Sequence, residues 1–217
     1  MWTYRGVKVH WLGHDSFVLQ GSRTLVFDPF KAKGDYRADV LLISHEHFDH
    51  LSPEDLRRFA GPSTTIVAPK ICEEPLRGFR QEKRFVDPDE DIEVKGVGVH
   101  AVRAYNINKF REPGKVFHPR ADDKVGYVVT LDGVRFYHAG DSDATPEMKA
   151  LDVDVAFLPV SGTYVMTAEE AAEAAKAMKV KVAVPMHFGS IVGDRRDAER
   201  FKALVGPSRA VEILEQE

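Results

Sequence analysis

The sequence is poor in cysteine, in side-chain amides and in long apolar runs. Cys72 is the only cysteine, so no disulfide can form within the chain. The longest apolar runs, such as the one over residues 155–160, are far shorter than the ~20 residues that a membrane span needs. The first residues contain no apolar stretch of signal-peptide length. We therefore expect a protein of a reducing, cytoplasmic compartment without a membrane span.

Basic residues are not in excess either, because 30 Lys and Arg stand against 34 Asp and Glu and give a formal charge of −4. A general nucleic-acid-binding surface is therefore not expected. Asparagine occurs only as Asn106 and Asn108, and glutamine only as Gln20, Gln81 and Gln216. Few amides beside many charged side chains are typical of heat-adapted proteins, although ordinary sampling also produces such a composition. If amides are avoided, the pair at 106 and 108 marks a segment with a specific role.

No linker, composition break or repeat divides the 217 residues, and we expect a single domain over residues 1–217. Helices are predicted to begin at Ser52, at Thr167, whose spacing to Glu170 fits a capping box, and at Asp197. Short apolar segments bounded by turn residues predict strands over residues 7–11, 16–20, 24–27, 39–44, 64–68, 92–94, 98–104, 125–131, 134–137, 154–158, 181–184 and 210–214. Hairpins and strand–helix alternation in both halves predict an α/β fold with sheets sandwiched between helices.

Four potential metal ligands, His45, His47, Asp49 and His50, lie within six residues. They follow a predicted buried strand and precede the predicted helix at Ser52. Because His45 and His47 are two positions apart, both can point to the same side of an extended backbone. The turn beyond them can divide the four groups between two neighbouring ions, and imidazoles with a carboxylate suit zinc. A solvated histidine-rich loop is the alternative, but such a loop does not require this spacing.

Two further candidate ligands also follow predicted strands. Asp141 comes after Gly140, which removes a side chain beside it, and a carboxylate there can bridge two cations. His187 lies at the exit of a later strand. Each alone is more typical of an ordinary turn or loop residue, and only the histidine cluster creates a demand for more ligands. His138 is left out because strand alternation points it away from Asp141.

In this order and at these strand ends, the motifs resemble the metallo-β-lactamase superfamily. The opening segment from Trp11 to Phe17, which contains His14, and the later Asp28-Pro29 pair are similar to the branch that contains ascorbate-phosphate lactonases and N-acylphosphatidylethanolamine-hydrolysing phospholipases. The similarity covers about residues 7–214 and is far more specific for fold and metal site than for substrate. It implies a four-layer αββα sandwich with a dinuclear centre, usually of zinc, at one edge of the paired sheets.

The resemblance also implies two ion sites that share one carboxylate. The ligands of the first ion would be His45 and His47, those of the second would be Asp49, His50 and His187, and the shared carboxylate would be that of Asp141.

One position departs from the family pattern. The family usually supplies a third histidine to the first ion from a place that falls within residues 103–109, where this chain has Asn106. Asparagine can coordinate only through its carbonyl oxygen. We predict that His118 replaces the missing ligand, with His100 as a lesser candidate. Two alternatives are open: His118 contacts the substrate, or the first site is weak and the protein is partly mononuclear.

Other residues near the expected site have two interpretations each. Asp28 either accepts a hydrogen bond from a ligand histidine or only ends a strand as an Asp-Pro turn. His14 either lines the cavity or is a structural histidine. Tyr164 either donates to an oxyanion or packs as an aromatic residue.

The segment 106–124 carries several basic residues, and it either forms a lid for an anionic substrate or is a solvated face. Asn106 and Lys109 are therefore candidates for contact with the substrate or with a metal ligand.

The resemblance and the ligand set together predict a metal-dependent hydrolase whose ions share a hydroxide oriented by Asp49, with the substrate class open among lactones or other esters, phosphodiesters and amides. Two Zn²⁺ are expected, with Mn²⁺ or Fe²⁺ as alternatives. The expected partner is a small molecule, which the basic segment would allow to be anionic, without nucleic acid, and the oligomeric state is left open. A diiron redox enzyme is disfavoured by the few carboxylates, and a nuclease by the lack of length for an inserted domain. A non-catalytic metal-binding or scaffold protein with an incomplete first site is the alternative.

Overall fold

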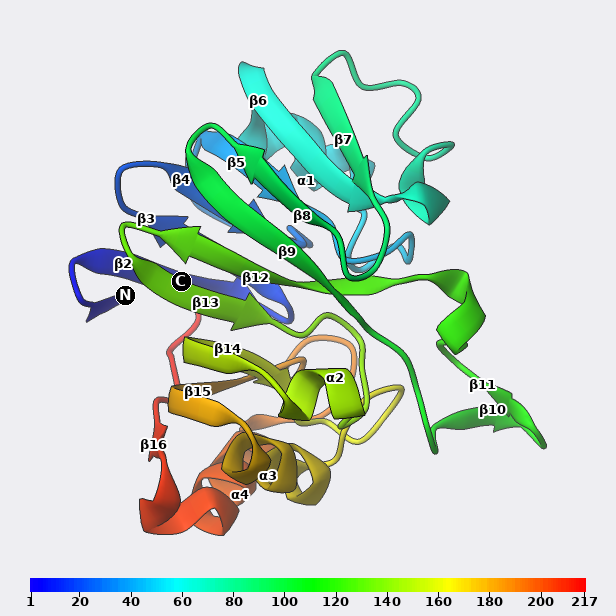
Figure 1. The fold of residues 1–217 in the computed structure, drawn as a ribbon, viewed down its shortest axis with the longest axis vertical. Coiled ribbons are helices and arrows are strands. Elements are labelled where there is room, and N and C mark those ends of the chain that lie inside the picture. Colours follow the sequence, from blue (N-terminus) through cyan, green and yellow to red (C-terminus); the bar gives the residue numbers. More distant parts are fainter.

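The computed structural model describes residues 1–217, and most of its strands belong to two seven-stranded sheets (Figure 1). The strands of the first sheet, in spatial order, are β1 (Trp2–Tyr4), β2 (Val7–Gly13), β3 (Ser16–Gln20), β4 (Thr24–Phe27), β5 (Ala38–Leu42), β6 (Ala60–Pro69) and β7 (Glu82–Val86). Those of the second sheet are β16 (Ala210–Val211), β15 (Lys179–Met186), β14 (Asp152–Pro159), β13 (Val134–His138), β12 (Val125–Leu131), β9 (Val97–Arg103) and β8 (Asp91–Val94). The two sheets are consecutive halves of the chain.

The remaining elements are four α-helices, three short 3₁₀ helices and a small hairpin. The α-helices are α1 (Pro53–Phe59), α2 (Pro146–Lys149), α3 (Ala168–Ala177) and α4 (Arg195–Val205). The 3₁₀ helices are Lys70–Cys72, Arg120–Asp122 and Gly206–Ser208. The hairpin of β10 (Phe110–Glu112) and β11 (Lys115–Val116) projects from the body of the molecule (Figure 1). No helix is both long and apolar enough to cross a membrane.

Alternation along the strands divides the apolar side chains between two cores. In β4, Leu25 and Phe27 belong to a cluster of 48 buried residues shared with the second sheet, whereas Val26 belongs to a cluster of 16. The smaller cluster includes Leu56 and Phe59 of α1, and the larger one includes residues of α3 and α4. Helices therefore cover the outer faces of both sheets, and the expected αββα sandwich is confirmed.

The predicted turn and cap signals have the expected local structure. Asp132 and Gly133 both have positive φ and join β12 to β13, as a tight hairpin requires. Ser52 caps α1, and Thr167 forms a complete capping box with Glu170 at the start of α3. Helix α4 begins slightly earlier than predicted, because Asp194 rather than a later residue provides its N-cap.

Several element predictions were incomplete or wrong. The strand predicted over 210–214 ends at Val211, and the one predicted over 39–44 ends its pairing at Leu42. Strands β1 and β7, the β10–β11 hairpin and α2 were not predicted. These elements are short or largely exposed, so they carry little apolar periodicity.

The sheet topology brings several strand ends to one edge of the sandwich. Strands β4, β5 and β6 are parallel to one another, as are β13, β14 and β15. The carboxyl ends of parallel strands lie at the same edge of a sheet, and that is where open α/β sheets bind ligands. The segments after β5, β13 and β15 carry His45, Asp141 and His187, respectively. The backbone topology alone therefore places the predicted ligands at the same edge of the sandwich.

Candidate metal centre

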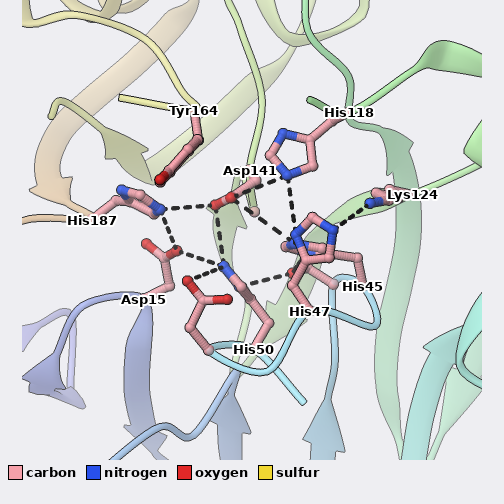
Figure 2. Close-up of polar contacts among 12 residues, drawn as sticks. Asp15, His45, His47, His50, His118, Lys124, Asp141, Tyr164 and His187 are labelled. Atoms are coloured by element: carbon pink, nitrogen blue, oxygen red, sulfur yellow. Dashed lines mark hydrogen bonds and ion pairs between the residues drawn. The ribbon is translucent and has the colours of Figure 1, made fainter. Parts of the chain in front are cut away.

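The side chains predicted to bind metal converge at this edge (Figure 2). Their ligand atoms form overlapping sets in which all atoms lie within 4.8 Å of one another. We call His45, His47, His118 and Asp141 the first ligand group. The second ligand group combines the other two sets and consists of His14, Asp15, Asp49, His50, Asp141 and His187.

The first ligand group comprises three imidazoles and one carboxylate oxygen. His47 Nδ1 lies 3.0 Å from His45 Nε2 and 3.3 Å from His118 Nε2. Asp141 Oδ2 lies 3.4 Å from His118 Nε2 and 3.9 Å from His45 Nε2. His118 is buried, although it comes from the loop after β11, far along the chain from the histidine cluster. His118 is therefore the third histidine of this group, which the sequence does not supply from residues 103–109.

Asn106 supports His118 instead of facing the cavity. Its Oδ1 accepts hydrogen bonds from both the backbone N–H and Nδ1 of His118, at 2.9 and 3.0 Å. Its Nδ2 donates to the backbone oxygen of Tyr164. Because Nδ1 of His118 carries the donated proton, Nε2 keeps a lone pair directed at the first ligand group. Of the two roles suggested for Asn106, contact with the substrate or support of a metal ligand, its hydrogen bonds fit the second.

Asp28 orients two ligand histidines. Its Oδ2 accepts from Nδ1 of His50 at 2.8 Å and from the hydroxyl of Ser44. The Ser44 hydroxyl in turn accepts from Nδ1 of His45 at 2.9 Å. In both histidines Nδ1 is therefore engaged by Asp28 or Ser44, and Nε2 is the nitrogen directed at the centre. Asp28 lies where the outer role suggested by the sequence requires it.

The second ligand group is more deeply buried and richer in carboxylates. Asp141 Oδ1 lies 3.2 Å from His50 Nε2 and 3.3 Å from His187 Nε2. Asp15 Oδ2 lies 3.4 Å from His50 Nε2 and 4.0 Å from His187 Nε2. The Nδ1 of His187 faces the Ser161 hydroxyl at 2.9 Å, which leaves its Nε2 directed at the carboxylates.

Asp49 and His14 complete the second ligand group on its open side. Nε2 of His14 lies 3.2 Å from Asp49 Oδ2, and Asp49 Oδ2 lies 4.0 Å from His50 Nε2. His14 is buried, whereas Asp49 is partly exposed and reaches the cavity. His14 therefore orients the carboxylate that the sequence singled out as catalytic. His138 points elsewhere, and its Nε2 lies 2.8 Å from the backbone oxygen of Asp15.

Unusual backbone conformations hold three of these residues. His14, Asp28 and His187 have φ values of 50°, 39° and 60°, in the left-handed region that residues other than glycine rarely adopt. Such conformations cost about 1–3 kcal/mol each and tend to cluster at functional sites. Gly140 is required beside Asp141, because a Cβ there would lie 2.9 Å from Cβ of Ser44. The local chain is thus shaped to aim side chains at the centre.

The two ligand groups differ in how they affect proton binding. Burial lowers the pKa of His45 well below its usual value and lowers the pKa of His118 to about 4. Burial opposes the charged form of His50 and His187 as well, but Asp141 and other carboxylates outweigh it. They raise the pKa of His50 well above its usual value and that of His187 to about 9. In the metal-free protein at neutral pH, the imidazoles of His45 and His118 are therefore neutral, and those of His50 and His187 are protonated.

The carboxylates respond to the same charges. Burial alone would raise the pKa of Asp141, but His187 and His50 hold it well below the usual range. Burial also opposes ionisation of Asp49, yet the hydrogen bond from His14 and the charge of His50 lower its pKa to about 2. Burial raises the pKa of Asp15. At neutral pH Asp49 and Asp141 are thus available as anionic ligands.

The donor set fits divalent cations. Zinc lies about 2.0–2.2 Å from nitrogen and oxygen ligands, so two ligands of one ion are roughly 3–4 Å apart. The distances within both ligand groups fall close to this range. In addition, His50 Nε2, His187 Nε2, Asp141 Oδ1 and both carboxylate oxygens of Asp15 are buried without a hydrogen-bond partner. Buried polar atoms without partners are costly, and a shared cation would satisfy all of these groups.

A cavity of about 330 Å³ opens onto both ligand groups. Its lining residues are His47, Phe48, Asp49, Phe117, His118, Asp141, Tyr164 and Ile191. Tyr164 is partly exposed, and its side chain points toward the centre (Figure 2). The side of the cavity away from the ligands is thus apolar and aromatic, without a basic side chain.

Lys109 does not lie where the sequence suggested. Its ammonium group lies 2.6 Å from Glu170 and 3.4 Å from Asp143, and it does not line the cavity. Of the other basic residues in the segment 106–124, Lys115, Arg120 and Lys124 form ion pairs with Glu112, Glu147 and Glu46. These ion pairs hold the Lys109 side chain away from the cavity, so contact of Lys109 with a substrate stays a prediction that its position does not support.

Sequence reasoning missed Asp15, Ser44, Ser161 and Lys124 as neighbours of the centre. Asp15 directly follows His14 within the segment that carried the family resemblance, and this position was the available signal. Lys124 is buried, with Nζ 3.2 Å from His47 Nε2 and 3.1 Å from Glu46 Oε1. No local pattern distinguishes it, because its contact with His47 spans 77 positions.

Comparison with known proteins identifies the family. Residues 8–187 match the family described as a beta-lactamase superfamily domain. The UPF0173 metal-dependent hydrolase of Thermoplasma acidophilum is 33% identical over 213 residues, which cover 92% of this chain and 91% of that protein. A solved structure from Parabacteroides distasonis is 31% identical with a TM-score of 0.84, and the match covers 97% of this chain and 94% of that one. Igni18, a metallo hydrolase from Ignicoccus hospitalis, shares the fold at 23% identity, with a TM-score of 0.78 and coverage of 96% and 95%. The chain therefore belongs to the beta-lactamase superfamily, within its UPF0173 metal-dependent hydrolases.

Proposed function

We propose that this protein is a hydrolase with a dinuclear centre, in which each ligand group binds one divalent cation and the first group binds zinc. The observation that carries this proposal is that Asp141 directs one oxygen at each group, with His118 at 3.4 Å on one side and His50 and His187 at 3.2 and 3.3 Å on the other. A carboxylate in this position can join two neighbouring cations. Three imidazoles with one carboxylate form a donor set typical of zinc.

Bound cations would lower the pKa of coordinated water and neutralise negative charge on the attacked group. The side chains of this protein would supply orientation. Asp49 lines the cavity as an anion held by His14, so it can accept a hydrogen bond from the attacking water. Tyr164 stands at the same cavity and can donate its hydroxyl proton toward an oxygen of the substrate. These roles suit attack of water on an acyl carbonyl.

The cavity lining favours an uncharged substrate with an apolar group next to the bond that is cleaved. Phe48, Phe117 and Ile191 line the cavity with Tyr164, and no lysine or arginine lines it. A phosphodiester would bring a negative charge against this surface without a basic partner beyond the cations. We therefore propose an ester or lactone with an apolar acyl chain as the substrate class, in preference to a phosphodiester.

A non-catalytic scaffold is supported less well. That alternative rested on an incomplete first site, and His118 lies where the missing ligand is needed. The cavity next to the ligands also provides space for a substrate that a purely structural metal site would not need.

A substrate panel on the metal-loaded protein tests the proposal. Metal-free protein would be loaded with zinc, with manganese or with both, and assayed on short- and medium-chain p-nitrophenyl esters, on acyl lactones, on bis(p-nitrophenyl) phosphate and on an amide. Metal-free protein with excess chelator is the control. We expect metal-dependent hydrolysis of esters or lactones, with kcat/KM rising with acyl chain length. Preferential cleavage of the phosphodiester would overturn the substrate class, and tight metal binding without any turnover would favour the scaffold.

A further inference from the structure

Asp15 is a completely buried carboxylate with no hydrogen-bond partner on either oxygen. Asp15 Oδ2 lies 3.4 Å from Nε2 of His50 and 4.0 Å from Nε2 of His187, and both of these nitrogen atoms also lack a hydrogen-bond partner. Figure 2 shows Asp15 facing these two histidines from the side opposite to Asp141. An ionisable group buried in this way is retained only where a charged partner compensates it.

The backbone around Asp15 is fixed, so the side chain cannot turn toward solvent without disrupting the fold. The backbone oxygen of His14 accepts from Nε1 of Trp11 at 2.9 Å and from the backbone N–H of His187 at 3.2 Å. The backbone oxygen of Asp15 faces Nε2 of His138 at 2.8 Å. The turn between β2 and β3 is therefore attached to the second sheet on both sides of the Asp15 side chain.

We propose that Asp15 is a ligand of the cation in the second ligand group, and that with it this group selects a hard, higher-coordinate cation such as Mn²⁺ or Fe²⁺ while the first group binds Zn²⁺. The inference rests on the proposed dinuclear centre and specifies its composition. It adds a third carboxylate, beside Asp49 and Asp141, to the two imidazoles of His50 and His187.

The two donor sets account for different metal preferences. The first group offers three imidazoles and one carboxylate oxygen, which match four-coordinate zinc. The second consists of two overlapping sets that share His50 and His187: one adds Asp15 and Asp141, and the other adds Asp49 and His14, whose Nε2 lies 3.2 Å from Asp49 Oδ2. Carboxylate oxygens suit Mn²⁺, and two histidines with a carboxylate are typical of non-haem Fe²⁺ sites. Together the two sets hold more donors than the four that structural zinc sites use.

Sequential loading tests the proposal without reference to activity. Metal-free wild-type protein, Asp15→Asn, Asp15→Ser and the control Asp154→Asn would each receive one equivalent of Zn²⁺, then an excess of Mn²⁺, and be desalted, because Zn²⁺ in excess outcompetes Mn²⁺ at any site of nitrogen and oxygen ligands. Bound metal would be counted by mass spectrometry, and the environment of Mn²⁺ would be recorded by electron paramagnetic resonance. Asp154 is a suitable control, because it is a buried aspartate on β14 that bonds to Arg135 and Lys181 away from the centre.

We expect wild type and Asp154→Asn to hold about one Zn²⁺ and one Mn²⁺ per chain. Asp15→Asn and Asp15→Ser are expected to keep the Zn²⁺, to bind Mn²⁺ at least about tenfold more weakly and to show an altered resonance of any Mn²⁺ that remains. Two variants are used so that, if one of them does not fold, the metal content of the other still tests the proposal.

Unchanged Mn²⁺ affinity in both Asp15 variants would overturn Asp15 as a ligand, and wild-type protein that holds its Zn²⁺ but no Mn²⁺ after this loading would overturn the metal preference. These outcomes are independent of the proposed reaction. Protein that binds both metals as expected but hydrolyses nothing in the panel contradicts the hydrolase proposal and leaves Asp15 in place. Protein that hydrolyses esters with unchanged metal binding in the Asp15 variants contradicts only the present inference.

Discussion

The two ligand groups lie side by side at one sheet edge and share Asp141, yet they are built differently. The first depends on loops: His45 and His47 are neighbours in one loop, His47 is partly exposed, and His118 arrives from a distant segment. The second takes Asp49 and His50 from that same loop, but it adds residues that follow strands β13 and β15 and residues of the β2–β3 turn, and most of its side chains are completely buried. Burial with few carboxylates leaves neutral imidazoles in the first group. Burial with several carboxylates leaves strongly proton-binding imidazoles in the second.

Removing the shared carboxylate of Asp141 should have the largest effect on metal binding and activity, because both ligand groups depend on it. Asp141 contacts histidines of both groups, so Asp141→Asn is expected to lose both ions. The loss in kcat/KM should exceed the ~100-fold that typically follows loss of a residue that only supports a ligand. Metal analysis and ester hydrolysis would be measured together, with Asp154→Asn as control. Retention of two ions by the variant would show that Asp141 does not join the groups.

Paired substitutions separate the two groups. His118→Ala is expected to lose the first ion and keep the second, and His187→Ala is expected to do the reverse. The reason is that His118 belongs only to the first ligand group and His187 only to the second, whereas Asp141 belongs to both. Metal stoichiometry of the two variants and of the double variant provides the readout. If His118→Ala has unchanged stoichiometry and activity, His118 is not a ligand and the first group is incomplete.

Much of the centre could be predicted from the sequence because its strongest motif is local. His45, His47, Asp49 and His50 come from one turn, and Asp141 and His187, which follow strands, could be added because this cluster demands further ligands and the order of the motifs resembles the superfamily. His118 was chosen only because the usual position holds Asn106. That Asn106 binds His118 depends on the path of the β10–β11 hairpin, which no local pattern describes.

The sequence is less informative about residues whose environment is set by distant contacts. Lys109 was a candidate by charge, but its ion pair with Glu170 joins segments 61 positions apart. Asp15 was overlooked because a single aspartate after His14 has no distinctive spacing. The central strands were predicted well because their apolar alternation is strong, whereas β1 and β7 lie at the sheet edge and are mostly exposed. Cytoplasmic location and heat adaptation stay predictions from composition.

Substitution of Asn106, which holds His118 of the first group, should have a smaller effect that is confined to that group. Asn106→Ala removes the acceptor for Nδ1 of His118 and leaves Nε2 free to carry the proton instead. The affinity for the first ion should fall about 10–100-fold, as is typical of residues that orient metal ligands. Zinc affinity would be measured by competition with a chromophoric chelator. Asn108→Ala is the matched control, because Asn108 bonds to Glu170 away from the ligands. Equal effects of the two changes would indicate that only loop stability is affected.

The opposite proton affinities of the two groups predict a pH dependence in metal-free protein. The pKa of His187 is raised to about 9, so its protonated form stabilises the fold fully below about pH 6.5. That stability is lost as the pH rises through about 9, and the loss is roughly 2–3 kcal/mol for a shift of this size. Urea unfolding between these pH values, in excess chelator, measures it.

Metal-free His187→Gln should show a flatter profile over the same range, because its side chain does not titrate. The metal-loaded protein should also lack this loss, since coordinated histidines are neutral. Stability that increases from about pH 6.5 to 9 in metal-free wild type would contradict the assignment of positive charge to the second group.

The smallest expected effect concerns the cavity that serves both groups. Tyr164 packs edge-on against Phe117, with ring centroids 4.7 Å apart, so Tyr164→Phe keeps the apolar surface and removes only the hydroxyl. If that hydroxyl donates to the substrate in the transition state, kcat should fall by roughly 10-fold while KM changes little. Phe117→Ala should instead raise KM most for long acyl chains. Neither Tyr164 nor Phe117 belongs to a ligand group, so both variants should keep the metal content of the wild type. A change in metal content would show that the cavity wall also affects metal binding.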